Sequence, residues 1–282
     1  MKVKITSDST CDLSPELVKK YDIGILPLLI TFGEEVFRDG IDATPEDIYR
    51  FVEETGTLPK TCALNTAEYE EFFRGWTDQG FALVHFCIGS KFSSTCQNAQ
   101  IAASSMDNVY VVDSGNLSAG QGLLVLRAAE LQKQGLSAKE IYEACTALVP
   151  FVEASFVLDD LEYLVKGGRC SGVAAFGANL LKLKPCIEVR SGVMEPTKKY
   201  RGRIQNVILD YVADRLTGRD DLDKGRIFIT HTRCDPEWVD AARKKVMELI
   251  PDFEEILETT AGATVTTHCG PSTLGILYIR KQ

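Results

Sequence analysis

The feature that most constrains the fold is a regular alternation of short apolar runs and helix signals in the first half of the chain. Residues 82–88 and 109–112 form short apolar runs, as strands buried on both faces of a parallel sheet should. Between them, residues 94–104 are rich in small side chains and indicate a connecting helix. This alternation predicts an α/β domain whose parallel sheet is covered by helices on both faces.

Other elements of this half follow from apolar runs and capping signals. Residues 3–6 and 25–32 are strand-like, and Ser14 before Pro15 is typical of a helix start. The segments Asn65-Thr-Ala-Glu68 and Ser137-Ala-Lys-Glu140 match the capping box, in which two side chains satisfy the first free amides of a helix. Two further helices are predicted at residues 44–54 and 121–134.

The pattern changes near residue 150, where short strands and turns replace the regular alternation. The predicted strands are residues 156–158, 187–190, 227–231 and 276–280, and the predicted helices between them are residues 204–216 and 236–249. This pattern of short strands interrupted by helices is typical of an α+β domain with a mainly antiparallel sheet. We therefore predict two domains, an α/β domain over residues 1–150 and an α+β domain over residues 151–282.

Composition narrows the class of function. A net charge of -9 argues against a nucleic-acid-binding protein, because neutralising phosphates requires a basic surface. Nine cysteines without a Cys-x-x-Cys pair indicate free thiols in a reducing compartment. The chain has no run of 18 apolar residues, and its first residues lack the apolar core of a signal peptide. We therefore expect a cytoplasmic protein that binds no nucleic acid.

Motifs of the common cofactor and metal sites are missing from the sequence. There is no phosphate-binding P-loop, and Gly120-Gln-Gly122 lacks the third glycine of a dinucleotide fingerprint. The three histidines lie too far apart for a zinc site. Asp8 and Asp12 follow the first predicted strand, and they either brace a turn or act as a catalytic pair.

Three segments far apart in the sequence place small polar side chains in turns that follow apolar, strand-like runs. They are Lys60-Thr-Cys62, Ser90-Lys-Phe-Ser-Ser-Thr95 and residues 266–275, which include His268 and Gly270. None of them carries a carboxylate or a metal cluster. At the carboxyl end of a buried strand, next to a helix start, such neutral donors favour a small anionic group.

Each of these residues also has an ordinary structural interpretation. Ser93 or Ser94 either caps the helix that begins there or donates to a ligand. Thr61 is equally at home as a loop hydroxyl, and His268 as a hydrogen-bonded structural histidine. No single one of the three establishes a site.

Several segments form a pattern when they are taken in order along the chain. They are Thr6-Ser-Asp-Ser-Thr-Cys-Asp12, Thr61-Cys-Ala-Leu64, Ser90-Lys-Phe-Ser-Ser-Thr-Cys96, Val112-Asp-Ser-Gly-Asn-Leu-Ser-Ala-Gly-Gln-Gly122, Leu161-Glu-Tyr-Leu-Val-Lys-Gly-Gly-Arg169, Leu183-Lys-Pro-Cys-Ile187 and Thr267-His-Cys-Gly-Pro271. In this order they resemble the DegV family of bacterial fatty-acid-binding proteins. The resemblance spans nearly the whole chain. Residues 62–64, Ser94 and Cys96 depart from the family pattern, so the preferred acyl chain stays open.

The resemblance implies one long-chain fatty acid bound between the two predicted domains. Thr61 and Ser93 then hold its carboxylate, His268 binds the carboxylate or orients Ser93, and Ser94 and Gly270 support this head-group site. It also implies a carrier without catalytic machinery of its own, which presents the acid to a separate fatty acid kinase for acyl-phosphate formation. We expect no cofactor and no metal, and a transient contact with a membrane fits such a carrier.

The charge distribution adds a candidate surface for the kinase. Residues 160–203 carry nine Lys or Arg and four Asp or Glu, which indicates either a solvated face or a docking surface. The resemblance ties Arg169 and Arg201 to kinase engagement. Two other functions stay open: a stand-alone phosphatase or acyltransferase using Asp8, Asp12 or a cysteine, and a DNA-binding regulator, against which the acidic charge argues.

Overall fold

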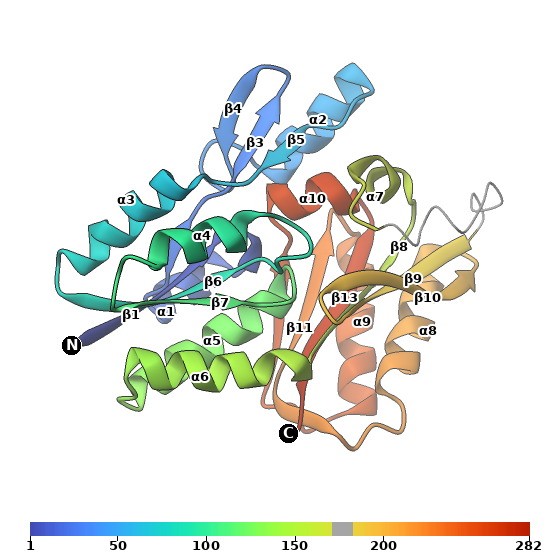
Figure 1. Ribbon diagram of the computed structural model, residues 1–282. Coiled ribbons are helices and arrows are strands. Elements are labelled where there is room, and N and C mark those ends of the chain that lie inside the picture. Colours follow the sequence, from blue (N-terminus) through green and yellow to red (C-terminus); the bar gives the residue numbers. More distant parts are fainter. Residues whose placement is uncertain (171–182) are drawn as a thin grey trace.

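The computed structural model describes residues 1–170 and 183–282, whose strands form sheets of four, three and six strands (Figure 1). The first sheet has the strand order β2-β1-β6-β7, and every neighbouring pair is parallel. Its strands are β1 (Lys2–Asp8), β2 (Gly24–Leu26), β6 (Phe81–Cys87) and β7 (Val109–Asp113). The parallel sheet predicted for the first half of the chain is therefore confirmed.

Helices cover this parallel sheet on both faces, also as predicted. Tyr69, Phe73 and Ala99 of α3 and α4 pack with Leu83 and Val109 on one face, and α5 and α6 pack on the other. The helices of this region are η1 (Ser9–Cys11), α1 (Pro15–Lys20), α3 (Thr66–Thr77), α4 (Thr95–Ala103), α5 (Ala119–Lys133) and α6 (Ala138–Leu148). The caps predicted at Ser14, Asn65 and Ser137 accept hydrogen bonds from the first turns of α1, α3 and α6.

One predicted strand is wrong, because residues 25–32 belong to two sheets. The run divides at Pro27 into β2 and β3, and proline cannot donate a ladder hydrogen bond, which favours the break. Strand β3 joins a small antiparallel sheet that the sequence did not reveal. Its strands are β3 (Leu29–Phe32), β4 (Glu35–Arg38) and β5 (Lys60–Cys62), and helix α2 (Pro45–Thr55) lies in the connection from β4 to β5.

The third sheet has the strand order β10-β9-β8-β13-β11-β12 and is mainly antiparallel, as predicted. Only the pair β11 and β12 is parallel among its described strands. The strands are β8 (Val152–Leu158), β9 (Leu183–Arg190), β10 (Val193–Arg201), β11 (Leu222–Thr232), β12 (Glu255–Thr260) and β13 (Thr273–Arg280). Helices α8 (Ile204–Leu216) and α9 (Pro236–Leu249) cover one face through a buried apolar cluster.

The other face of this sheet packs against helix α5, which therefore lies between the parallel and the antiparallel sheet (Figure 1). Leu124, Leu126 and Leu277 belong to one continuous apolar cluster across that junction. A shared core of this kind joins the two halves tightly. The boundary near residue 150 stays a prediction, and β8 begins at Val152 after the short helix η2 (Val149–Phe151).

A short helix, α10 (Ala263–Cys269), brings the second half of the chain back to the first. Ala263 packs with Ile30 and Ile48 of the small sheet and α2, and α10 also contacts α7 (Glu162–Gly167). The amide N–H groups of Gly262 and Ala263 donate to carboxylates of the first half. Helix α10 is thus fixed from both sides.

Across the described residues, no helix combines the length and the apolar character needed to cross a membrane. The thiols of Cys11, Cys87 and Cys145 are buried and form no disulfide.

Candidate functional site

A pocket of about 390 Å³ lies where the parallel sheet, the small sheet and α10 meet. Thr61, Ser93 and His268, the three predicted donors, all line it, although they come from segments far apart in the sequence. Thr61 is on β5, Ser93 is in the loop between β6 and α4, and His268 is on α10. The structure therefore brings together the residues that the sequence could only place separately. We call this cavity the head-group pocket.

Two of the expected local settings are wrong. Thr61 and His268 were expected in turns, but Thr61 lies in a strand paired with Ile30, and His268 lies in the last turn of α10. His268 also contacts Thr61 rather than Ser93: its Nε2 lies 3.0 Å from the hydroxyl oxygen of Thr61. The histidine is therefore placed to orient the threonine.

His268 is held in its neutral form. Burial, with a smaller contribution from the positive charge of Arg169, lowers its pKa from 6.5 to about 4. Its Nδ1 is buried and has no hydrogen-bond partner among the described residues. Gly167 of α7 lies so close that a β-carbon there would be 2.4 Å from this nitrogen. A neutral imidazole adds no charge to the pocket and serves as a hydrogen-bonding group.

Ser93 caps the helix that follows it. Its hydroxyl oxygen accepts the amide N–H of Thr95 at 3.2 Å and lies 2.8 Å from the Thr95 hydroxyl. Ser94 occupies the N-cap position of α4, but its exposed side chain makes no capping hydrogen bond. The Ser93 hydroxyl thus braces the first turn of α4, and its donation to a ligand stays a prediction.

Gly270, which was predicted to support the head-group site, has a special backbone conformation. It ends α10 with φ of 68°, a conformation that favours glycine. A β-carbon at this position would lie 2.7 Å from the ring of Tyr163, so the glycine lets α7 pack directly on the end of α10. Of these two helices, α10 lines the pocket, through residues that include His268.

The two arginines predicted to engage a kinase have different positions. Arg169 is exposed, lines the head-group pocket and donates to the carbonyl of Gly167 at 2.8 Å. Arg201 is exposed at the end of β10, outside the pocket lining. Arg201 lies at the end of the antiparallel sheet where β8 leads into α7. This position follows from two pairings, of Arg201 with Leu183 and of Cys186 with Val157. Residues 171–182 of the basic stretch lie outside the described residues.

An apolar crevice continues from the head-group pocket into the junction between the two halves. It measures about 30 Å³, and Leu117, Val265 and Cys269 line both cavities. Phe156 and Leu277 of the antiparallel sheet form its far wall. The sequence carried no signal for these residues, because apolar pocket residues and core residues have the same composition.

Asp8 and Asp12 brace the chain rather than face the head-group pocket. Asp8 is fully buried and accepts amide N–H groups from Thr10 and Ile88 at 3.1 and 2.8 Å. Asp12 accepts the Ser118 hydroxyl and the amide N–H of Gly262, the latter at 2.8 Å. Burial raises the pKa of both carboxyl groups. The bracing interpretation from the sequence is confirmed by these contacts.

The remaining groups of the site offer little to covalent or metal chemistry. Burial raises the pKa of the Cys269 thiol, which lines the pocket, to about 12, so it stays protonated and poorly nucleophilic at neutral pH. No cluster of three or more His, Cys, Asp or Glu side chains suited to a metal ion occurs within residues 1–170 and 183–282. Among the described residues, the polar groups that line the pocket are hydroxyls, the thiols of Cys62 and Cys269, one neutral imidazole and one guanidinium.

The lowered pKa of His268 predicts that stability falls as the pH drops below about 6.5. Between that value and about 4, the unfolded chain binds a proton that the folded protein excludes, so the contribution is complete above pH 6.5 and is lost toward pH 4. At pH 5 this linkage amounts to about 2 kcal/mol. Urea midpoints at pH 7.5 and 5 should therefore differ more for the wild type than for His268→Gln. Equal differences would contradict a neutral His268 in the folded protein.

Known proteins resemble this chain over its whole length. The family model described as "Uncharacterised protein, DegV family" matches residues 2–281. A DegV domain-containing protein of Clostridium acetobutylicum is 30% identical, over 99% of each chain. A fatty-acid-binding DegV family protein of Thermus thermophilus superposes with a TM-score of 0.88 at 29% identity, over 99% of this chain and 100% of that one. A stearic acid-binding protein of Eubacterium ventriosum superposes with a TM-score of 0.81 at 28% identity, over 99% and 98%.

Proposed function

The chain belongs to the DegV family, and from this premise we propose that it binds one long-chain fatty acid. The carboxylate lies in the head-group pocket between the hydroxyls of Thr61 and Ser93, with His268 orienting Thr61. The acyl chain follows the apolar crevice between the two halves of the molecule. Solved relatives described as fatty-acid-binding proteins support the ligand class.

The observation that carries this proposal is the convergence of Thr61, Ser93 and His268 on one pocket that continues into an apolar crevice. Hydroxyl donors suit a carboxylate taken out of water, because each hydrogen bond to a charged group contributes roughly 1.5–3 kcal/mol. Arg169 lines the same pocket, so a positive charge lies near the proposed carboxylate position. A single anionic head group satisfies these donors.

The tail supplies the greater part of the binding free energy. About fifteen methylenes at ~0.8 kcal/mol each give on the order of 12 kcal/mol before the costs of association. Because the crevice measures about 30 Å³, binding requires its apolar walls to move apart. Leu117, Val265 and Cys269 lie at the point where the two cavities join, so they are the first side chains that the tail meets.

We further infer that the protein is a carrier and not an enzyme. The Cys269 thiol, which lines the head-group pocket, stays protonated, and the buried Asp8 and Asp12 are occupied by structural hydrogen bonds. The carrier presents the carboxylate to a separate fatty acid kinase, and Arg169 and Arg201 form part of the kinase contact. Unbridged cysteines support a cytoplasmic location, and loading from a membrane requires only transient contact.

Mass spectrometry of the organic extract of purified protein tests this proposal directly. We expect about one long-chain fatty acid per chain. After delipidation, added palmitate or oleate should raise the melting temperature, because a ligand that binds only the folded state stabilises it. A gently purified protein without lipid, whose melting temperature neither acid changes, would show that the chain is not a fatty acid carrier.

A further inference from the structure

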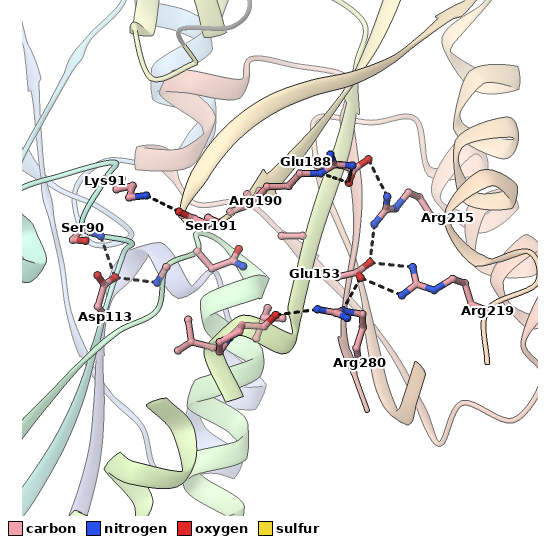
Figure 2. A pocket seen from close by; sticks show the side chains of 18 residues that line it. Ser90, Lys91, Asp113, Glu153, Glu188, Arg190, Ser191, Arg215, Arg219 and Arg280 are labelled. Carbon is pink, nitrogen blue, oxygen red and sulfur yellow. Dashed lines mark hydrogen bonds and ion pairs between the residues drawn. The ribbon is translucent and has the colours of Figure 1, made fainter. Parts of the chain in front are cut away.

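A second and larger cavity, of about 680 Å³, lies between the two halves (Figure 2). It arises where β9 leaves β8. The two strands pair from Val157 and Cys186 as far as Ser155 and Glu188, but the next residues of each strand diverge. The space opened between Ala154 and Val189 is the cavity, which we call the arginine pocket.

The first half of the chain closes this pocket from the opposite side. The Lys91 ammonium donates to the backbone carbonyl of Ser191, at the tip of the hairpin between β9 and β10, at 2.9 Å (Figure 2). Asp113 lies on the same wall, where its carboxylate accepts the amide N–H groups of Ser90 and Gly115 at 3.0 and 2.9 Å. Residues from both halves of the chain, held by hydrogen bonds, therefore form the walls of the pocket.

The lining is positively charged in a protein of net charge -9. It contains five cations and three carboxylates, and the cations are Lys91, Arg190, Arg215, Arg219 and Arg280. Asp221 binds Arg219 from outside the lining, and counting it still leaves one positive charge in excess. A concave surface with an excess of one sign of charge concentrates small ions of the opposite sign.

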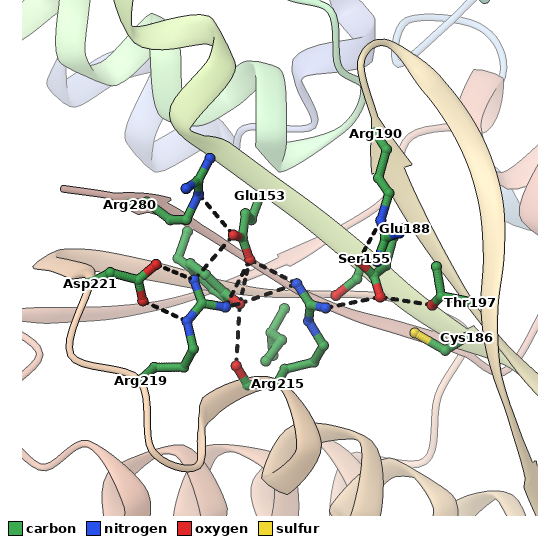
Figure 3. Close-up of polar contacts among 12 residues, drawn as sticks. Glu153, Ser155, Cys186, Glu188, Arg190, Thr197, Arg215, Arg219, Asp221 and Arg280 are labelled. Atoms are coloured by element: carbon green, nitrogen blue, oxygen red, sulfur yellow. Dashed lines mark hydrogen bonds and ion pairs between the residues drawn. The ribbon is translucent and has the colours of Figure 1, made fainter. Parts of the chain in front are cut away.

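Figure 3 shows that two carboxylates hold these guanidinium groups in place. Glu153 forms ion pairs with Arg215, Arg219 and Arg280 at 2.8, 3.1 and 2.9 Å. Glu188 forms ion pairs with Arg215 and Arg190 at 2.9 and 3.0 Å. One carboxylate shared by three guanidiniums fixes their positions without neutralising them.

Some arginine N–H donors are not used in the ion pairs with Glu153 and Glu188. The Nε of Arg215 is buried and has no hydrogen-bond partner among the described residues, and a buried donor left unpaired is costly. The side chains of Arg190 and Arg280 are 57% and 37% exposed, so each can offer N–H groups to the cavity. Val149, Pro150 and Val152 form an apolar wall in the same pocket.

We propose that the arginine pocket binds a phosphate-bearing small molecule with an apolar portion, at a site separate from the fatty acid head group. Guanidinium forks that approach from several directions suit a phosphate, whose oxygens point several ways, better than a planar carboxylate that fills one fork. The wall at Val149, Pro150 and Val152 accommodates the apolar portion.

Titration calorimetry on the full-length, lipid-loaded protein tests the site with phenyl phosphate, inorganic phosphate and benzoate as probes. We expect saturable one-to-one binding of phenyl phosphate, weaker binding of inorganic phosphate, and weakening of both as salt rises. Benzoate has the same ring and a single carboxylate. If it bound as tightly as phenyl phosphate, the assignment to phosphate would be wrong.

Variants locate the binding within the protein. Arg190→Gln and Lys91→Gln change exposed side chains and should weaken phenyl phosphate binding about ten-fold each, while bound fatty acid is retained. Arg243→Gln, which removes an ion pair with Glu258 outside the pocket, is the matched control and should bind normally. Absence of saturable binding up to about 10 mM probe, or equal affinities in all three variants, would show that the network only joins the two halves.

Discussion

The double variant Thr61→Ala/Ser93→Ala is expected to lose fatty acid binding while keeping its fold. Both hydroxyls line the head-group pocket, and each contributes a hydrogen bond to the carboxylate of roughly 1.5–3 kcal/mol. Their joint removal should raise the dissociation constant about 10²- to 10⁴-fold. Displacement titrations of delipidated protein with a fluorescent fatty acid measure this change.

A matched control distinguishes the pocket from a general effect of lost hydroxyls. Thr55→Ala/Ser104→Ala removes two exposed hydroxyls that bind helix carbonyls outside the pocket, and its affinity should stay at the wild-type value. His268→Ala should weaken binding less than the double variant, because its contact is with Thr61. If Thr61→Ala/Ser93→Ala bound fatty acid with wild-type affinity, the carboxylate would have to bind outside this pocket.

The parallel sheet was predictable because its signal is local. Each buried strand is a short apolar run, and caps such as Asn65 and Ser137 mark the helix starts within a few residues. The small sheet was not predictable in the same way. Its strands β4 and β5 are only four and three residues long, and β3 continues an apolar run from β2, so only Pro27 marks the division.

Helix α10 shows where tertiary contacts override local preference. Its residues Thr264, Val265, Thr266 and Thr267 are all β-branched, which disfavours a helix. The helix nevertheless forms because Asp12 and Asp39 accept the amide N–H groups of Gly262 and Ala263 at its start. Both carboxylates come from distant parts of the chain, so the setting of His268 could not be read from its neighbours.

The resemblance grouped Thr61, Ser93 and His268, which do line one pocket, but it did not predict the geometry of that pocket. Thr61 and His268 are separated by 207 positions, and their contact exists only through the packing of α10 against the small sheet. The arginine pocket was missed for a similar reason. Arg215 and Arg280 come from α8 and β13, and their common partner, Glu153, lies on β8. Charge counts along the sequence cannot reveal such a convergence.

The second large effect concerns delivery of the fatty acid to the kinase. Arg169→Ala and Arg201→Ala should each abolish most acyl-phosphate formation by the partner kinase, because an arginine at the centre of an interface often contributes 2 kcal/mol or more, about 30-fold in affinity. Both side chains are exposed, and Arg201 lies at the end of the antiparallel sheet where β8 leads into α7. Phosphate release or product analysis with kinase and nucleotide measures the loss.

The position of Arg169 makes the readout of bound lipid decisive. Because Arg169 lines the head-group pocket and Arg201 does not, only Arg169 has a second way to affect phosphorylation, through the carboxylate itself. Both arginines belong to the kinase contact if the two variants lose phosphorylation but keep their fatty acid and their melting temperature. The exposed control Arg50→Ala should be phosphorylated normally. Loss of lipid from Arg169→Ala alone would instead make it a carboxylate ligand, and normal phosphorylation in both variants would remove the two arginines from the interface.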